Sequence, residues 1–139
     1  MSKNFYLSIF FILFFNVISA QNPIEWITNS EKINDSTYNL ITTAKIENNW
    51  RLYSQYNEEG GAILTEFIFS DSLILKNYSE VIEPEPITKF DPVFNLDQSY
   101  FVDEVTFNQR IVLSTKEQDL VNQTVYYQVC DDRVCIFQE

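Results

Sequence analysis

Histidine is absent from the whole sequence of 139 residues. Its absence excludes Ser-His-Asp and Cys-His catalytic sites and any metal centre ligated by imidazole. Cysteine is nearly as scarce, because Cys130 and Cys135 are the only two in the sequence, too few for a cysteine-rich zinc site. The sequence therefore predicts neither a metal ion nor another cofactor, and the chemistry that remains is that of carboxylates and thiols.

Basic residues are few as well: 9 Lys and Arg stand against 20 Asp and Glu, for a net charge of −11. Nucleic-acid binding requires the opposite sign, and anionic membrane surfaces are disfavoured for the same reason. The acidic residues are scattered along the chain, which is typical of a soluble surface that repels its neighbours. We expect no nucleic-acid partner.

The one pronounced apolar run is IFFILFFNVI, at residues 9–18. Lys3 precedes it and Ser-Ala follows it, an arrangement typical of a secretory signal peptide. An uncleaved membrane anchor fits less well, because Asn16 interrupts the run and a spanning helix needs about 20 apolar residues. We expect residues 1–20 to be a signal peptide, and residues 21–139 to be exported without stable membrane insertion.

Residues 21–139 predict one all-β domain, because apolar and polar residues alternate with a period of two. The expected strands are 24–28, 37–46, 50–56, 65–70, 104–114 and 123–130, with a return strand at 135–138. Turn-forming clusters separate several of them, and only residues 114–121 could make a helical turn. About seven short strands in a domain of this size indicate an immunoglobulin-like antiparallel β-sandwich.

Residues 83–104 interrupt the alternation and predict an irregular loop with three prolines. Phe90, Phe94, Tyr100 and Phe101 argue against disorder, because a loop with such rings has apolar groups to pack. Two interpretations follow: the rings close the end of the sandwich core, or they form a lid over a functional site.

Cys130 and Cys135 are predicted to face each other across a hairpin whose loop is DDRV. A disulfide that closes so short a loop removes only about 2 kcal/mol of unfolded-state entropy, so it would stabilise the domain weakly. As a redox couple the placement is better, because a mixed disulfide formed at one sulfur is resolved by the other. Asp131 and Asp132 should disfavour a thiolate more than Arg133 favours it. From spacing alone, a redox pair and an inert bridge both stay open.

Four stretches of the sequence form a further, longer pattern. They are IEWITNSEKINDSTYNLITTAKI (24–46), NNWRLYSQYNEEGGAILTEFIF (48–69), FDPVFNLDQSYFVDEVTFNQRI (90–111) and YYQVCDDRVCIFQE (126–139). In this order they resemble the amino-terminal domain of DsbD-type thiol:disulfide interchange proteins, or protein-disulfide reductases, in their Bacteroidetes-like form. The sequence departs from that family at Arg51, where the family has His, and after Cys135, where a Pro pair is replaced by IFQ.

The resemblance implies an immunoglobulin-like periplasmic module with thiol:disulfide oxidoreductase activity, in which Cys130 and Cys135 cycle between dithiol and disulfide. It implies an aromatic cap loop over the pair, beginning at Asp97, with Tyr100 and Phe101 as the shielding rings. A thioredoxin-like or membrane electron donor would act in trans, and periplasmic disulfide proteins would be the acceptors. The alternative is a non-catalytic, secreted immunoglobulin-like binding module whose disulfide is structural.

Overall fold

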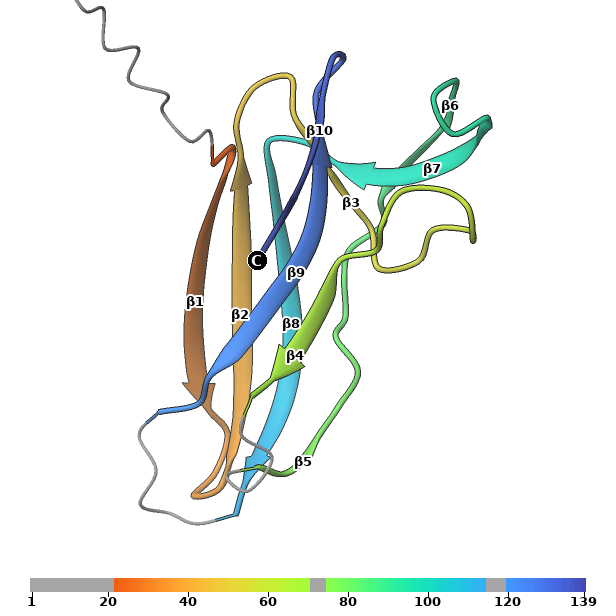
Figure 1. Ribbon diagram of the computed structural model, residues 1–139. Helices are drawn as coiled ribbons and strands as arrows, with labels where there is room; N and C mark the ends of the chain where they lie inside the picture. The colour runs from red at the N-terminus through yellow and green to blue at the C-terminus, as the bar shows by residue number, and fades with distance from the viewer. Residues whose placement is uncertain (1–21, 71–74, 115–119) are drawn as a thin grey trace, which may run out of the picture.

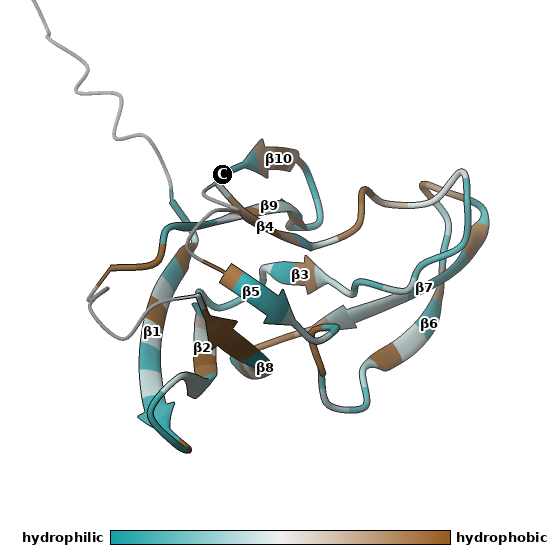
Figure 2. Ribbon diagram, turned by 90° about the horizontal axis from the view of Figure 1, so that it is seen from below, coloured by the Kyte–Doolittle hydropathy of each residue, from teal (hydrophilic) through white to brown (hydrophobic). Residues whose placement is uncertain are grey.

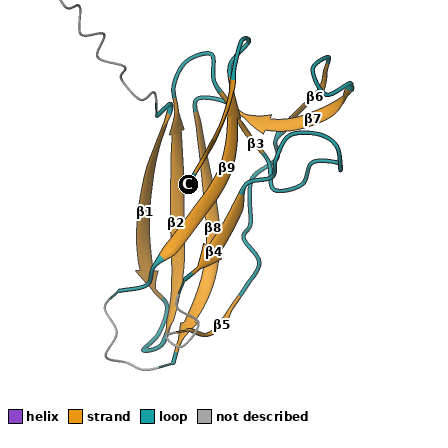
Figure 3. Cartoon of the chain, viewed as in Figure 1, coloured by secondary structure: helices purple, strands orange, loops and turns teal. Residues whose placement is uncertain are grey.

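The computed structural model describes residues 22–70, 75–114 and 120–139. The predicted signal peptide at 1–20 and most of the possible helical turn at 114–121 lie outside these ranges. Strands and loops account for all of the described chain (Figure 3), so none of its segments is a helix able to cross a membrane.

The described part of the chain contains ten strands. They are β1 (Ile24–Lys32), β2 (Thr37–Ile46), β3 (Arg51–Tyr53), β4 (Glu66–Phe69), β5 (Leu75–Tyr78), β6 (Ile87–Asp91), β7 (Leu96–Phe101), β8 (Glu104–Leu113), β9 (Gln123–Cys130) and β10 (Cys135–Gln138). One sheet has the order β1-β2-β8-β5, and the other has the order β10-β9-β3-β7-β6, with β4 also paired to β9. All the pairings are antiparallel, and Figure 1 shows the long strands running side by side. The predicted all-β, immunoglobulin-like sandwich is confirmed.

The core lies between the two sheets, which appear as separate layers when viewed along the strands (Figure 2). β8 alternates strictly between buried and less buried positions, as its period-two sequence predicts, and it pairs with β2 over nine residues. Phe107 on β8 is 1% exposed and lies at the centre of an aromatic group. Its ring centroid is 5.0 Å from that of Phe67 and 5.9 Å from that of Phe101. Burial of these rings contributes to the apolar stabilisation of the domain.

Residues 83–104 are not the irregular loop that the sequence predicted. They contain the β6–β7 hairpin, which projects sideways from the upper end of the sandwich (Figure 1). Its turn is built locally: the Asp91 carboxylate accepts the amide of Val93 at 2.8 Å, and Asn95 takes a left-handed φ of 56°. The prediction was wrong because β6 is almost wholly exposed, so it shows no apolar alternation, while β7 is fixed by pairing with β3.

Candidate functional site

The six-stranded sheet has two faces with different surroundings, because successive side chains of a strand point to opposite sides. On β9, Val129 is fully buried in the core between the sheets, and Cys130 points to the outer face. On β3, Leu52 lies in the core and Tyr53 on the outer face. Cys130 and its surroundings therefore lie on the outer face of the sheet.

A small apolar cluster covers the outer face at this point. Its buried members are Tyr53, Ala62 and Cys130, and the rings of Phe94 and Tyr100 pack against them. The ring of Tyr53 meets that of Phe94 edge to face with centroids 6.0 Å apart, and that of Tyr100 at 6.4 Å. We call these five residues the outer cluster. It surrounds one of the two sulfurs with apolar groups that exclude water.

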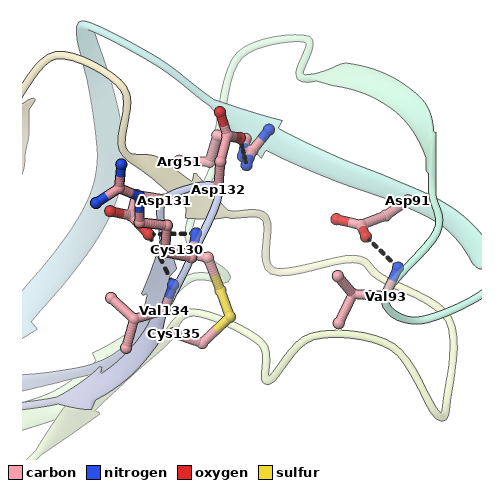
Figure 4. Close-up of polar contacts among 9 residues, drawn as sticks. Arg51, Asp91, Val93, Cys130, Asp131, Asp132, Val134 and Cys135 are labelled. Atoms are coloured by element: carbon pink, nitrogen blue, oxygen red, sulfur yellow. Dashed lines mark hydrogen bonds and ion pairs between the residues drawn. A yellow bond between two sulfur atoms is a disulfide. The ribbon is translucent and has the colours of Figure 1, made fainter.

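Cys130 and Cys135 are directly opposite in the β9–β10 ladder and form a disulfide, with their Cα atoms 4.1 Å apart. The predicted hairpin is thus confirmed, and its yellow sulfur bond is drawn in Figure 4. The two cysteines differ in exposure: Cys130 is 2% exposed, whereas Cys135 is an exposed residue. A reagent in solution can therefore reach the Cys135 side of the bond.

The turn between the cysteines is held by one carboxylate. Asp131 Oδ1 accepts the backbone amides of Arg133 and Val134, each at 2.7 Å, while the Asp131 amide donates to the Val134 carbonyl (Figure 4). The hydrogen bonds from Val134 and Arg133 lower the pKa of Asp131 below its usual value. The turn thus depends on an ionised side chain that follows Cys130 directly.

Arg51 lies directly opposite Cys130 in the β3–β9 ladder, where the sequence departs from the family pattern. Its Nη2 donates to Asp132 Oδ1 at 2.6 Å, and its guanidinium lies 5.8 Å from the centre of the Tyr100 ring. Burial lowers the pKa of Arg51, but the hydrogen bond and charge of Asp132 outweigh it, and the net shift is upward. Arg51 Nε is buried and has no hydrogen-bond partner among the described residues.

A cleft of about 370 Å³ opens beside the disulfide. It is lined by the two cysteines, by Arg51, Tyr53 and Tyr100 from β3 and β7, by Asp131 and Asp132, and by residues 89–94 of the β6–β7 hairpin. Burial, with the nearby charge of Asp91, raises the pKa of Tyr53 to about 12, so its phenol stays neutral. The cleft thus gives a partner access to the disulfide, and the aromatic rings that pack around Cys130 form part of its lining.

The residues predicted for the site are only partly brought together. Cys130 and Cys135 are bonded, and Tyr100 lies in the outer cluster. Phe101, the next residue of β7, points into the core between the sheets, and Asp97 is exposed on β7 opposite Phe90. Tyr100 and Phe101 cannot both face the pair, because they are neighbours on one strand.

Sequence reasoning did not identify three residues that surround the pair. Phe94 was considered only as one of several loop aromatics, Tyr53 only as part of a strand, and Arg51 only as a departure from the family pattern. All three line the cleft. The period-two alternation of "WRLY" does place Arg51 and Tyr53 on one face, but the pairing of β3 with β9 was needed to bring Cys130 beside them.

This arrangement defines a class: a β-sandwich domain that carries a disulfide, reachable from solvent on one side, in a hairpin suited to thiol–disulfide exchange. Residues 25–139 match the family model described as "Thiol:disulfide interchange protein DsbD, N-terminal". The chain belongs to this family, and the resemblance noted in the sequence is confirmed.

One solved structure has the same fold, and a second is more distantly similar. The N-terminal periplasmic domain of ScsB from Proteus mirabilis has a TM-score of 0.65 and 18% sequence identity, covering 85% of this chain and 44% of that one. The N-terminal domain of Neisseria meningitidis DsbD in the reduced form has a TM-score of 0.48 and 14% identity, covering 80% of this chain and 76% of that one. This chain thus spans less than half the length of the ScsB structure. No curated protein matches the sequence.

Proposed function

We propose that this domain relays reducing equivalents through Cys130 and Cys135 to periplasmic disulfide proteins. The observation that carries the proposal is the unequal exposure of the pair, with Cys135 open to the cleft and Cys130 buried in the outer cluster. Membership of the DsbD N-terminal family supports the same chemistry. The electron donor would be a thioredoxin-like or membrane protein acting in trans.

The exposed sulfur determines the order of bond changes in this proposal. A donor thiolate attacks Cys135 Sγ, a bond forms between these two sulfurs, and the Cys130–Cys135 bond breaks with its electron pair leaving on Cys130. The donor's second thiolate then attacks the donor sulfur of the mixed disulfide and releases Cys135 as a thiolate. The donor is oxidised to a disulfide, and the pair is reduced by two electrons. Passing electrons to an acceptor disulfide is the reverse sequence.

Phe94 and Tyr100 act in this proposal as the aromatic cap. Both rings pack against Tyr53 beside Cys130, and Phe94 lies at the turn of the β6–β7 hairpin. Movement of that turn would widen the cleft when a partner docks, and its closed position would restrict the access of small thiols and oxidants to the Cys130 side of the bond between encounters. Asp97 and Phe101 would then support the hairpin and the core rather than the cap.

We place the working domain in the periplasm, after removal of residues 1–20 as a signal peptide. The thiol–disulfide chemistry supports this location, because disulfides persist in exported compartments. The domain would bind thiol–disulfide partners through the end of the sandwich that carries the β9–β10 and β6–β7 hairpins.

The test is the reduction potential of the pair, measured by equilibration with glutathione or dithiothreitol buffers. We expect a value between about −120 and −300 mV, the range of proteins that exchange disulfides. A value well below about −300 mV would refute the relay in favour of the non-catalytic binding module with a structural bond. Transfer from a reduced thioredoxin, tested beside a Cys135→Ser control that cannot re-form the pair, would show whether a donor in trans suffices.

A further inference from the structure

We propose that the side-chain amide of Gln128 stabilises the Cys130 thiolate that leaves when Cys135 is attacked. Gln128 thereby makes the pair easier to reduce and is a catalytic residue of the exchange, because it touches a reacting sulfur. This inference rests on the proposed function, and it assigns a role to a residue that forms no part of the outer cluster.

The amide lies against the sulfur because of strand geometry. Gln128 and Cys130 are two apart on β9, so they point to the same face of the sheet. Gln128 is 9% exposed and Cys130 is 2% exposed. Gln128 Nε2 is 3.5 Å from Cys130 Sγ, within hydrogen-bonding distance for a sulfur acceptor.

The orientation of this amide is determined by a second contact. Gln128 Oε1 accepts the backbone amide of Ile63 at 2.7 Å. A flipped amide would place its NH2 group against that N–H and its oxygen against the sulfur, which would lose both hydrogen bonds. The amide donor is therefore directed at Cys130 Sγ, and it is already in place before the disulfide opens.

The contact matters more in the reduced form than in the oxidised form. A disulfide sulfur is a weak acceptor, whereas a thiolate accepts a stronger, charge-assisted hydrogen bond. Because Cys130 is buried, its leaving thiolate cannot be fully solvated by water, and an unpaired charge there would be costly. A donor whose bond strengthens as charge develops on Cys130 lowers the barrier to attack at Cys135.

Charged and titratable groups from the surrounding elements also line the cleft beside the disulfide. They are Arg51 and Tyr53 on β3, Tyr100 on β7, Lys89 and Asp91 on β6, and Asp131 and Asp132 in the hairpin turn. Gln128 is uncharged, so substituting it with another neutral residue leaves these groups unchanged. A difference in the reduction equilibrium between the wild-type protein and such a variant therefore measures the effect of the Gln128 amide.

The experiment compares Gln128→Met with a matched control, Gln98→Met. Gln98 is 0% exposed, and its Oε1 accepts the Ala62 amide at 2.8 Å while its Nε2 donates to the Asp97 carbonyl. Each glutamine thus holds the same loop, at adjacent residues, but only the Gln128 amide is bonded to sulfur. Met keeps the length of the side chain and removes its donor and acceptor.

For Gln128→Met, at a pH at which the Cys130 thiol of the reduced protein is ionised, we expect the equilibrium constant for reduction by dithiothreitol to fall about tenfold, equivalent to about 30 mV. In the reduced protein, the Cys130 thiolate, followed by its ultraviolet absorbance in a Cys135→Ser background, should form about one pH unit higher. Gln98→Met should lower the free energy of unfolding but leave both quantities near those of the wild type.

A Gln128→Met variant with the reduction equilibrium and the Cys130 thiol pKa of the wild type would overturn the inference. Equal shifts of these two quantities in Gln98→Met would also overturn it, because the effect would then come from the loop that both glutamines hold. If Gln128→Met fails to fold, Gln128→Glu provides the second test: a carboxylate beside the sulfur should lower the reduction equilibrium further, and an unchanged value would refute the proposal. A reduction potential of the wild-type pair well below about −300 mV would reject the proposed relay but not the role of Gln128. The reduction equilibria of the two glutamine variants could still be compared in that case.

Discussion

Arg51 and Asp132 join β3 to the turn of the β9–β10 hairpin, although they are 81 residues apart in the sequence. The ion pair spans 2.6 Å, and Arg51 is also the cross-strand neighbour of Cys130. A charge pair therefore fixes the cysteine hairpin against the sheet beside the disulfide. Its strength is limited, because the Asp132 side chain is 85% exposed while that of Arg51 is 29% exposed.

Asp132→Ala should lower the free energy of unfolding by less than about 1 kcal/mol, and the loss should shrink at high salt. Arg51→Ala should cost more, about 1–2 kcal/mol, because it also removes the contact of the guanidinium with Tyr100 and the packing of the side-chain stem. Urea unfolding at low and high salt measures both. Equal losses in the two variants would mean that only the ion pair contributes.

Phe94→Ala should speed reduction of the disulfide by a small thiol several-fold, because the ring packs on Tyr53 beside Cys130. Tyr100→Ala should act in the same direction. Phe90→Ala is the matched control, since Phe90 is on the same hairpin and also lines the cleft, but is 61% exposed and lies outside the outer cluster. The rate of disulfide reduction in each variant can be followed with a thiol-reactive dye. An unchanged rate in Phe94→Ala would mean that the Phe94 ring does not shield the pair.

Phe101→Ala should behave differently from Tyr100→Ala. Phe101 is 6% exposed in the core against Phe107, so truncation should leave a cavity and cost about 3–5 kcal/mol. Reduction of the folded protein should proceed near the wild-type rate. A Phe101→Ala variant with wild-type stability and faster reduction of the disulfide would show instead that Phe101 shields the pair.

Reduction of the disulfide should lower the free energy of unfolding by only about 2 kcal/mol, because the bond closes a short loop that the hairpin already brings together. Unfolding of the wild-type protein with and without dithiothreitol measures this without any substitution. A domain that unfolds outright on reduction would show that the bond is a main structural element.

Asp131→Ala should destabilise the hairpin at neutral pH, where the ionised carboxylate accepts two backbone amides. The pKa of Asp131 is lower in the folded state than its usual value of 3.8. The ionised carboxylate therefore contributes fully to stability at pH values above 3.8, and this contribution is lost as the pH falls through the folded-state pKa. The stability difference between wild type and variant should therefore shrink below about pH 4. A difference that is constant over pH 2–7 would mean that the charge of the carboxylate is irrelevant.

Local features of the sequence were sufficient for the long strands and the cysteine hairpin, but not for β5, β6 and β7. The period-two pattern of residues 37–46 and 104–114 predicted β2 and β8, and it did so because alternate side chains must enter one core. The spacing of Cys130 and Cys135 predicted their opposition across a tight turn. The prediction of an irregular loop at residues 83–104 was wrong, because an exposed strand such as β6 has no alternation of apolar and polar residues.

The sequence by itself determined the class of fold, the exclusion of histidine-dependent chemistry, and the position of the cysteine pair, because each depends on composition or on residues close together in the chain. Only the tertiary structure decided what surrounds the pair. Pairing of β3 with both β7 and β9 brings Arg51, Tyr53 and Tyr100 beside Cys130, and places Phe101 on the opposite face. Such neighbours depend on the register between distant strands, which no local pattern in the sequence specifies.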